Sequence, residues 1–109
     1  MSEKAVELTE ANFDSEISEG VTLVDFWAPW CGPCKMMGPV IDSVAEKVGD
    51  KAVVAKLNVD EARGVAGKFG ITSIPAIFIF KDGIPAKQMV GMQQENALVS
   101  ALEEIISEG

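Results

Sequence analysis

Apolar and polar positions along the first half of the chain predict alternating strands and helices. Residues 21–27 are almost continuously apolar, as expected for a strand that is covered on both faces. Apolar residues at helical spacing follow over 37–48, and Gly49 is a natural place for that helix to stop. Residues 52–59 are a second β-rich run, and 61–68 fits a short helix that two internal glycines weaken.

The second half of the chain predicts a hairpin followed by a helix. Residues 76–80 have the composition of a strong strand, and Asp82-Gly83 is a turn signal that leads into a second strand over 84–90. Pro85 suits an edge strand, which needs no partner for that nitrogen. A final amphipathic helix is marked by Leu98, Leu102, Ile105 and Ile106.

Near the amino terminus, Thr9 could cap a helix that buries Phe13 and Ile17, so the elements follow the order β-α-β-α-β-α-β-β-α. Alternation in the first part implies parallel strands with crossover helices, and the late hairpin adds antiparallel strands to the same sheet. The 109 residues contain no repeat or long linker. We therefore expect one α/β domain over 1–109, with a mixed five-stranded sheet and helices on both faces.

Composition and charge argue against several classes of protein. The chain is 48% hydrophobic, too apolar for a disordered chain, and no apolar run is long enough to cross a bilayer. Nine Lys and Arg against 17 Asp and Glu give a net charge of −8, which argues against nucleic acid or an anionic membrane as a partner. The first residues lack the basic-then-apolar pattern of a secretion signal. We expect a cytoplasmic monomer.

Both cysteines of the chain stand in one short motif, three residues apart. On a helix, positions i and i+3 lie on one face, so Cys31 and Cys34 can form a disulfide with little backbone movement. The closed loop is too short for a strong structural cross-link, and a dithiol switch explains the pair better. Without histidine or a third cysteine, one chain offers at most half of a zinc site, although two chains could share a metal.

Cys31 follows the buried strand at the point where the next helix begins. Free backbone N–H groups and the helix dipole favour negative charge there, so we expect Cys31 to attack a disulfide as a thiolate. Cys34, one turn inside the helix, should be more buried and should resolve the mixed disulfide. Gly32 and Pro33 add no positive charge or extra donor to the thiolate, which favours a reductant over a strong oxidant.

Asp25 is the unusual residue of the strand over 21–27. With a period of two it shares a face with Leu23 and Trp27, so burial should raise the pKa of its carboxyl group. An acid with a raised pKa close to Cys34 could move the proton that this thiol must lose. A purely structural role, as an ion pair or a hydrogen-bonded acid, is about as well supported by the sequence alone.

Three motifs together resemble the thioredoxin family: Trp-Cys-Gly-Pro-Cys-Lys at 30–35, Ile74-Pro75 before a strand, and Lys81-Asp82-Gly83 at the hairpin. The likeness extends over essentially the whole chain and implies the thioredoxin fold. It also implies a general protein-disulfide reductase and dithiol electron carrier with no bound cofactor, because the sulfurs of the redox-active pair carry both electrons. The partners would be disulfide-containing target proteins and a thioredoxin reductase, with the NADPH and flavin type favoured over a ferredoxin-linked one.

The resemblance assigns roles to residues beyond the cysteines. Lys56 matches a lysine that lies near the buried aspartate of thioredoxins, which favours the proton-transfer role of Asp25. Most X-Pro bonds are trans, but the Ile74–Pro75 bond is expected to be cis because the matching proline is cis and faces the cysteines. The backbone of Ile74 could then pair with an extended substrate segment.

An apolar collar is expected around the cysteines, where Gly91 would admit the substrate backbone. Exposed apolar patches commonly mark protein contacts, so broad specificity for protein disulfides follows. Val59 and Val90 would serve equally well as core residues. Ser73, Ala76 and Met92 depart from the usual family pattern and bear on specificity rather than on the reaction. The expected collar comprises Trp30, Val59, Ile74, Val90 and Met92.

Other functions remain open on the sequence alone. A binding module of the same fold could carry the cysteines incidentally, and activity that survives loss of both cysteines would support it. An oxidase or isomerase is disfavoured by Gly32-Pro33 and by the missing secretion signal. A metal-bridged dimer is the remaining alternative.

Overall fold

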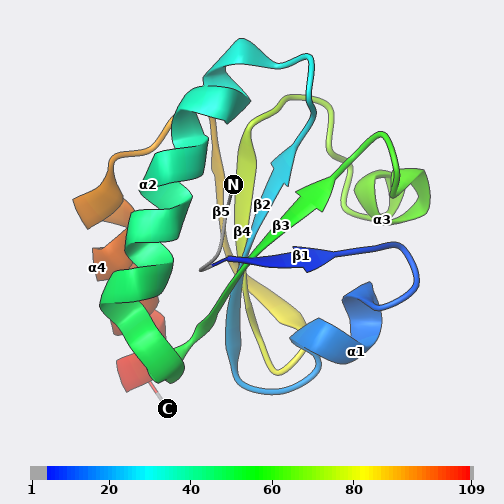
Figure 1. Cartoon of the computed structure of the whole chain (residues 1–109). Helices are drawn as coiled ribbons and strands as arrows, with labels where there is room; N and C mark the ends of the chain where they lie inside the picture. The colour runs from blue at the N-terminus through cyan, green and yellow to red at the C-terminus, as the bar shows by residue number, and fades with distance from the viewer. Residues whose placement is uncertain (1–4, 109) are drawn as a thin grey trace.

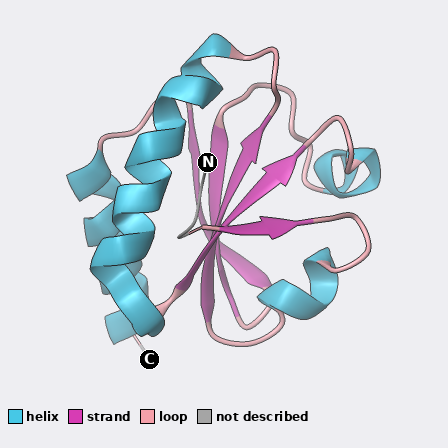
Figure 2. Cartoon of the chain, viewed as in Figure 1, coloured by secondary structure: helices cyan, strands magenta, loops and turns pink. Residues whose placement is uncertain are grey.

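The computed structural model describes residues 5–108, which form a five-stranded sheet with helices on both faces (Figure 1, Figure 2). The strands are β1 (Val6–Leu8), β2 (Val21–Trp27), β3 (Val53–Asn58), β4 (Ala76–Lys81) and β5 (Ile84–Val90). The helices are α1 (Phe13–Ile17), α2 (Gly32–Val48), α3 (Arg63–Lys68) and α4 (Glu95–Ser107), and a 3₁₀ turn, η1 (Gly49–Lys51), follows α2. The α/β class and the expected element order are confirmed.

Strand β2 lies at the centre of the sheet, whose order is β1-β3-β2-β4-β5. It runs parallel to β3 and antiparallel to β4, while β1 is parallel to β3 and β5 is antiparallel to β4. The turn between β4 and β5 has positive φ angles at Asp82 and Gly83, as a two-residue hairpin of this kind requires. The parallel first half and the late hairpin therefore join in one mixed sheet, as predicted.

Two apolar layers enclose the sheet. On one face, Leu23 and Ile77 belong to a cluster with Met37 of α2 and Leu102 of α4. On the other face, α1 and α3 cover a layer rich in aromatic rings, whose centroids lie 5.3–6.5 Å apart in the paired contacts. The rings of this second layer belong to Phe13, Phe26, Phe69, Phe78 and Phe80.

Helix ends follow local signals in two places. The Thr9 hydroxyl accepts a hydrogen bond from the N–H of Asn12 at 3.2 Å, and the Asn12 side chain accepts one from the N–H of Thr9 at 2.7 Å. This reciprocal pair closes the turn that leads into α1, so Thr9 caps the turn while α1 itself begins at Phe13. Gly49 ends α2 with a φ of 59°, as its position predicts.

The sheet topology brings distant segments to one edge. Because β4 runs antiparallel to β2, its first residue, Ala76, pairs with Phe26 near the end of β2. Ala76 also pairs with Val90 at the end of β5. The segments holding Cys31, Pro75 and the residues after β5 therefore meet at the same end of the molecule. None of the helices in the described part of the chain is long and apolar enough to cross a membrane.

Candidate active site

Cys31 and Cys34 form a disulfide at the start of α2, with their Cα atoms 5.2 Å apart. Cys31 is the N-cap residue, with an extended backbone, and its sulfur accepts a hydrogen bond from the N–H of Cys34 at 3.2 Å. The N–H of Lys35 donates to the carbonyl oxygen of Cys31 at 3.2 Å and begins the helical hydrogen bonding. The Cys31 sulfur therefore lies at the positive end of the helix dipole, where negative charge is stabilised.

The two residues between the cysteines add no side-chain charge or side-chain donor near this sulfur. Gly32 and Pro33 are exposed, and the first turn contains no acidic residue. Proline is well placed there because the first helical N–H groups have no partner within the helix. Cys31 is 6% exposed and Cys34 is 3% exposed. Cys34 is the more buried of the two, as expected, but the difference in exposure is small.

The residues before β4 and after β5 lie beside the disulfide. The Ile74–Pro75 bond is cis, as the resemblance implied. The carbonyl oxygen of Ile74 lies 3.9 Å from the Cys31 sulfur. The N–H of Gly91 donates to the carbonyl oxygen of Pro75 at 2.8 Å, and a Cβ on Gly91 would meet no atom within 4 Å. The backbone before Pro75 thus lies close to Cys31, the carbonyl of Pro75 is bonded to Gly91, and there is open space beside Gly91.

The predicted collar residues divide into two groups. Val59 and Ile74 are partly buried and pack against the cluster of Ala28 and the two cysteines. Val59 also packs against the phenylalanine layer, so it belongs to both core and collar. The exposed group consists of Trp30 at 69%, Val90 at 55% and Met92 at 50%.

Trp30 is held in place by a residue that the sequence analysis did not single out. Its indole N–H donates to a carboxylate oxygen of Asp60 at 2.9 Å. Asp60 directly follows the collar residue Val59 in the sequence. The backbone N–H of Asp60 in turn donates to the side-chain oxygen of Asn58 at 2.9 Å. The Trp30 ring is therefore fixed to the segment that follows β3.

Asp25 lies in the middle of β2 and is 1% exposed. Its Oδ1 atom has no hydrogen-bond partner within the described part of the chain. Desolvation by burial raises the pKa of this carboxyl from 3.8 to about 7, against a smaller lowering by the positive charge of Lys56. Lys56 is the residue paired with Asp25 in the neighbouring strand β3. The predicted burial and raised pKa are both present.

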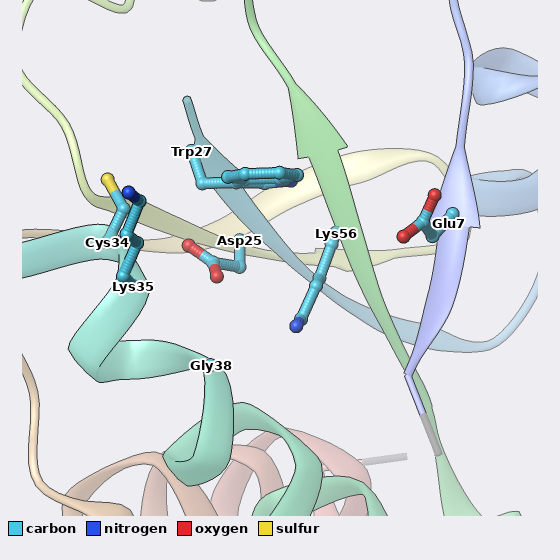
Figure 3. Close-up of a pocket in the computed structure, with 7 residues that line it drawn as sticks. All are labelled: Glu7, Asp25, Trp27, Cys34, Lys35, Gly38 and Lys56. Carbon is cyan, nitrogen blue, oxygen red and sulfur yellow. The ribbon is translucent and has the colours of Figure 1, made fainter. Parts of the chain in front are cut away.

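A cavity of about 300 Å³ lies behind the disulfide and connects Asp25 with Cys34 (Figure 3). Lys56 extends into this space, and a Cβ on Gly38 of α2 would lie 3.7 Å from its Nζ atom. Sequence reasoning did not find Glu7, because its position depends on how β1 pairs with β3. The lining residues are Glu7, Asp25, Trp27, Cys34, Lys35, Gly38 and Lys56.

A family model described as Thioredoxin matches residues 4–104 of the chain. The chain belongs to the thioredoxin family. Among curated thioredoxins, that of Staphylococcus saprophyticus is 48% identical over 99 residues, covering 91% of this chain and 95% of the relative. Thioredoxin 2 of Chlorobaculum tepidum is 51% identical over 108 residues, covering 97% of this chain and 99% of the relative.

Solved structures show the same thioredoxin fold. A mutant thioredoxin from Halobacterium salinarum NRC-1 superposes with a TM-score of 0.85 at 35% identity, covering 94% of this chain and 91% of its own. As a member of this family, the chain is a protein-disulfide oxidoreductase that reduces disulfides through Cys31 and Cys34.

Thioredoxins work with a reductase and with disulfide-containing target proteins, and they need no cofactor beyond the cysteine pair. Within residues 5–108, no group of three or more His, Cys, Asp or Glu side chains is arranged to hold a metal ion. The reaction that the family carries out at its cysteine pair is thiol–disulfide exchange.

Proposed function

We propose that Cys31 is the nucleophile and Cys34 the resolving cysteine of this reductase. The supporting observation is that the Cys31 sulfur caps α2 while Cys34 lines the cavity that contains Asp25. The Cys31 thiolate attacks one sulfur of the target disulfide, which breaks, and the second target sulfur leaves as a thiolate that takes up a proton. The product is a mixed disulfide between Cys31 and the target.

Cys34 completes the transfer in the second step. Its thiol gives a proton to the Asp25 carboxylate, and the resulting thiolate attacks the Cys31 sulfur. The mixed disulfide breaks, the target leaves with both of its sulfurs reduced, and the Cys31–Cys34 disulfide forms. Two electrons have then passed from the cysteine pair to the target. Lys56 supports the ionised form of Asp25 through its positive charge.

Targets would bind as extended segments across the backbone of Ile74 and Pro75, with Gly91 leaving room for the incoming chain. The collar of Trp30, Val59, Ile74, Val90 and Met92 would supply apolar contact that does not depend on one target sequence. This arrangement fits a general reductase of protein disulfides rather than an enzyme for one substrate.

We assign the remaining features to a single-domain, cytoplasmic monomer that carries electrons between an NADPH-dependent flavin reductase and its targets. The net charge of −8 supports partners other than nucleic acid or anionic membranes. A reduction assay that supplies NADPH with a flavin thioredoxin reductase, in parallel with a ferredoxin-linked reductase, tests this choice. Faster turnover with the ferredoxin-linked enzyme would reverse it.

The order of the two cysteines is tested by trapping. Cys34→Ser is expected to accumulate the mixed disulfide with a target protein, whereas Cys31→Ser should trap none, as read by mass spectrometry. The double variant should lose reductase activity. A cellular function that survives in the double variant, without reductase activity, would instead support a binding module whose cysteines are incidental.

The direction of electron flow is tested by the reduction potential of the pair in a defined dithiol buffer. A value near about −270 mV is expected for a reductant of this type. A potential above about −180 mV would place the chain with oxidases and isomerases.

The proton-transfer role is tested by Asp25→Asn. Wild-type turnover should show a limb near pH 7, because Asp25 ionises there. The variant should lose this limb and turn over more slowly at pH 7. An unchanged pH profile would mean that Asp25 has a structural role only.

A further inference from the structure

Lys56 lies between two acidic residues on neighbouring strands. The strand register pairs Lys56 with Asp25 of β2 on one side and with Glu7 of β1 on the other. Residues paired in this way point to the same face of a sheet. All three line the cavity that also contains Cys34, and Figure 3 shows Lys56 between Asp25 and Glu7. A carboxylate, an ammonium group and a second carboxylate thus form a row that ends beside Cys34.

The two carboxylates have different surroundings. Asp25 is buried at the centre of the sheet, whereas Glu7 is exposed on the edge strand β1. Within residues 5–108, Lys56 is held in a close ion pair with neither of them. The position of its ammonium group relative to the two carboxylates would decide how strongly it favours the ionised form of Asp25.

We propose that Glu7 is a positioning residue: its carboxylate competes with Asp25 for the Lys56 ammonium and so sets the pH range in which Asp25 exchanges its proton. The consequence for turnover rests on the proton-transfer role proposed for Asp25. One further charge faces the same cavity, Lys35 of α2. Glu61 lines an adjoining cavity of about 250 Å³ together with Glu7 and Lys56.

The effect of Glu7 has a definite sign. Its negative charge opposes ionisation of Asp25 directly and also draws the Lys56 ammonium away, and both effects make Asp25 hold its proton to higher pH. At a strand spacing of about 4.8 Å, β1 and β2 lie about 10 Å apart. One unit charge at that distance shifts a titration by about 0.3–0.6 pH unit for an effective dielectric constant of about 80–40. Salt should reduce the shift because Glu7 is exposed.

The test is a carbon-13 NMR titration of the Asp25 carboxyl in the oxidised protein. Glu7→Gln should lower the midpoint at low salt by more than the direct effect of about 0.3–0.6 pH unit, because release of Lys56 adds to it, and by less in about 1 M NaCl. Glu16→Gln is the matched control, because Glu16 lies on α1, on the opposite face of the sheet, and the change removes the same charge. An unchanged midpoint in Glu7→Gln, or an equal shift in the control, would overturn the proposal.

Repeating the Glu7→Gln titration in a Lys56→Met variant separates competition for Lys56 from the direct effect of the Glu7 charge on Asp25. In Lys56→Met, only the direct effect of about 0.3–0.6 pH unit should remain, so Glu7→Gln should shift the midpoint by less than it does in the wild type. A full-size shift in that background would contradict competition for Lys56.

The midpoint measured by NMR does not depend on catalysis. If Asp25→Asn leaves the pH profile of target reduction unchanged, the proton-transfer role fails, while the titration still decides whether Glu7 acts on Asp25. If Asp25 transfers the proton and Glu7 acts on Asp25, the pH profile of target reduction by Glu7→Gln should move to lower pH. The displacement should equal the shift of the Asp25 midpoint.

Discussion

At the scale of single residues, burial and charge oppose each other at Asp25. The side chain is 1% exposed at the centre of β2, where desolvation favours the protonated acid. Lys56 on the neighbouring strand only partly offsets this cost. The burial that raises the pKa of Asp25 must therefore weaken the fold whenever the group is ionised.

This cost predicts how stability depends on pH. The pKa of Asp25 is about 7 in the folded protein against an ordinary value of 3.8, so between these values the folded state holds a proton that the unfolded state has lost. The free energy of unfolding should fall as pH rises from about 4 to about 8, by at most about 4 kcal/mol. Urea unfolding of the oxidised protein at pH 5 and pH 8.5 should capture at most about 3 kcal/mol of this fall.

Asp25→Asn removes the titrating group and is the natural comparison. Its free energy of unfolding should depend less on pH over the same interval, and at pH 8.5 the variant should be the more stable protein. Equal pH dependence in wild type and variant would show that Asp25 is not the source.

The sequence predicted a site residue when its position follows from nearby residues, and missed it when its position depends on the pairing of distant strands. Asp25 was found because alternation along its own strand places it on a buried face. Glu7 was missed because only the pairing of β1 with β3 brings it to Lys56, and that register is not local information. The intrinsic preference of an X-Pro bond favours trans, so the cis bond before Pro75 came from the resemblance and not from local propensity.

At the scale of elements, α2 has two functions, since its first turn holds the disulfide and its apolar side packs on the sheet and on α4. Met37 and Ile41 of α2 share one cluster with Leu98 and Leu102 of α4. The long helices were predicted well because their apolar spacing is regular. The short helix α3 was predicted over 61–68 but begins at Arg63, because the backbone of Ala62, with φ −134° and ψ 58°, lies outside the helical region.

Removal of one buried side chain from α4 should therefore weaken the packing between α4 and α2 and lower the stability of the fold. Leu102 is fully buried, and Leu102→Ala is expected to lower the free energy of unfolding by about 2–5 kcal/mol through lost burial and a residual cavity. Glu103→Ala, at the exposed neighbouring position, should change it by less than about 0.5 kcal/mol. Denaturant unfolding of both variants measures the contrast, and similar losses would show that α4 contributes no specific packing.

At the scale of the whole molecule, the site lies at one end of an acidic protein. Its parts come from the start of α2, the segment before β4 and the segment after β5, which the antiparallel pairing of β4 brings together. The chain carries a net charge of −8, whereas the side chains of the collar are apolar. Encounter with a target should thus depend on the charge of the target, and close contact on its apolar surface.

The net negative charge predicts a preference for positively charged targets that weakens as salt is added. At low ionic strength, a disulfide peptide flanked by lysines should be reduced several-fold to about tenfold faster than one flanked by glutamates. In about 0.5 M salt the two rate constants should converge, because exposed charges are screened. Stopped-flow measurements with a neutral peptide as reference test this, and equal rates at low salt would contradict it.

The position of the aromatic residues has an optical consequence. The chain contains two tryptophans and no tyrosine, and both tryptophans adjoin the disulfide: Trp27 packs against Cys31 and Cys34, and Trp30 directly precedes Cys31. A disulfide quenches an excited indole in contact with it, so the ultraviolet emission of this protein should brighten when the bond opens. Electron transfer could then be followed in a cuvette, in real time and without a dye.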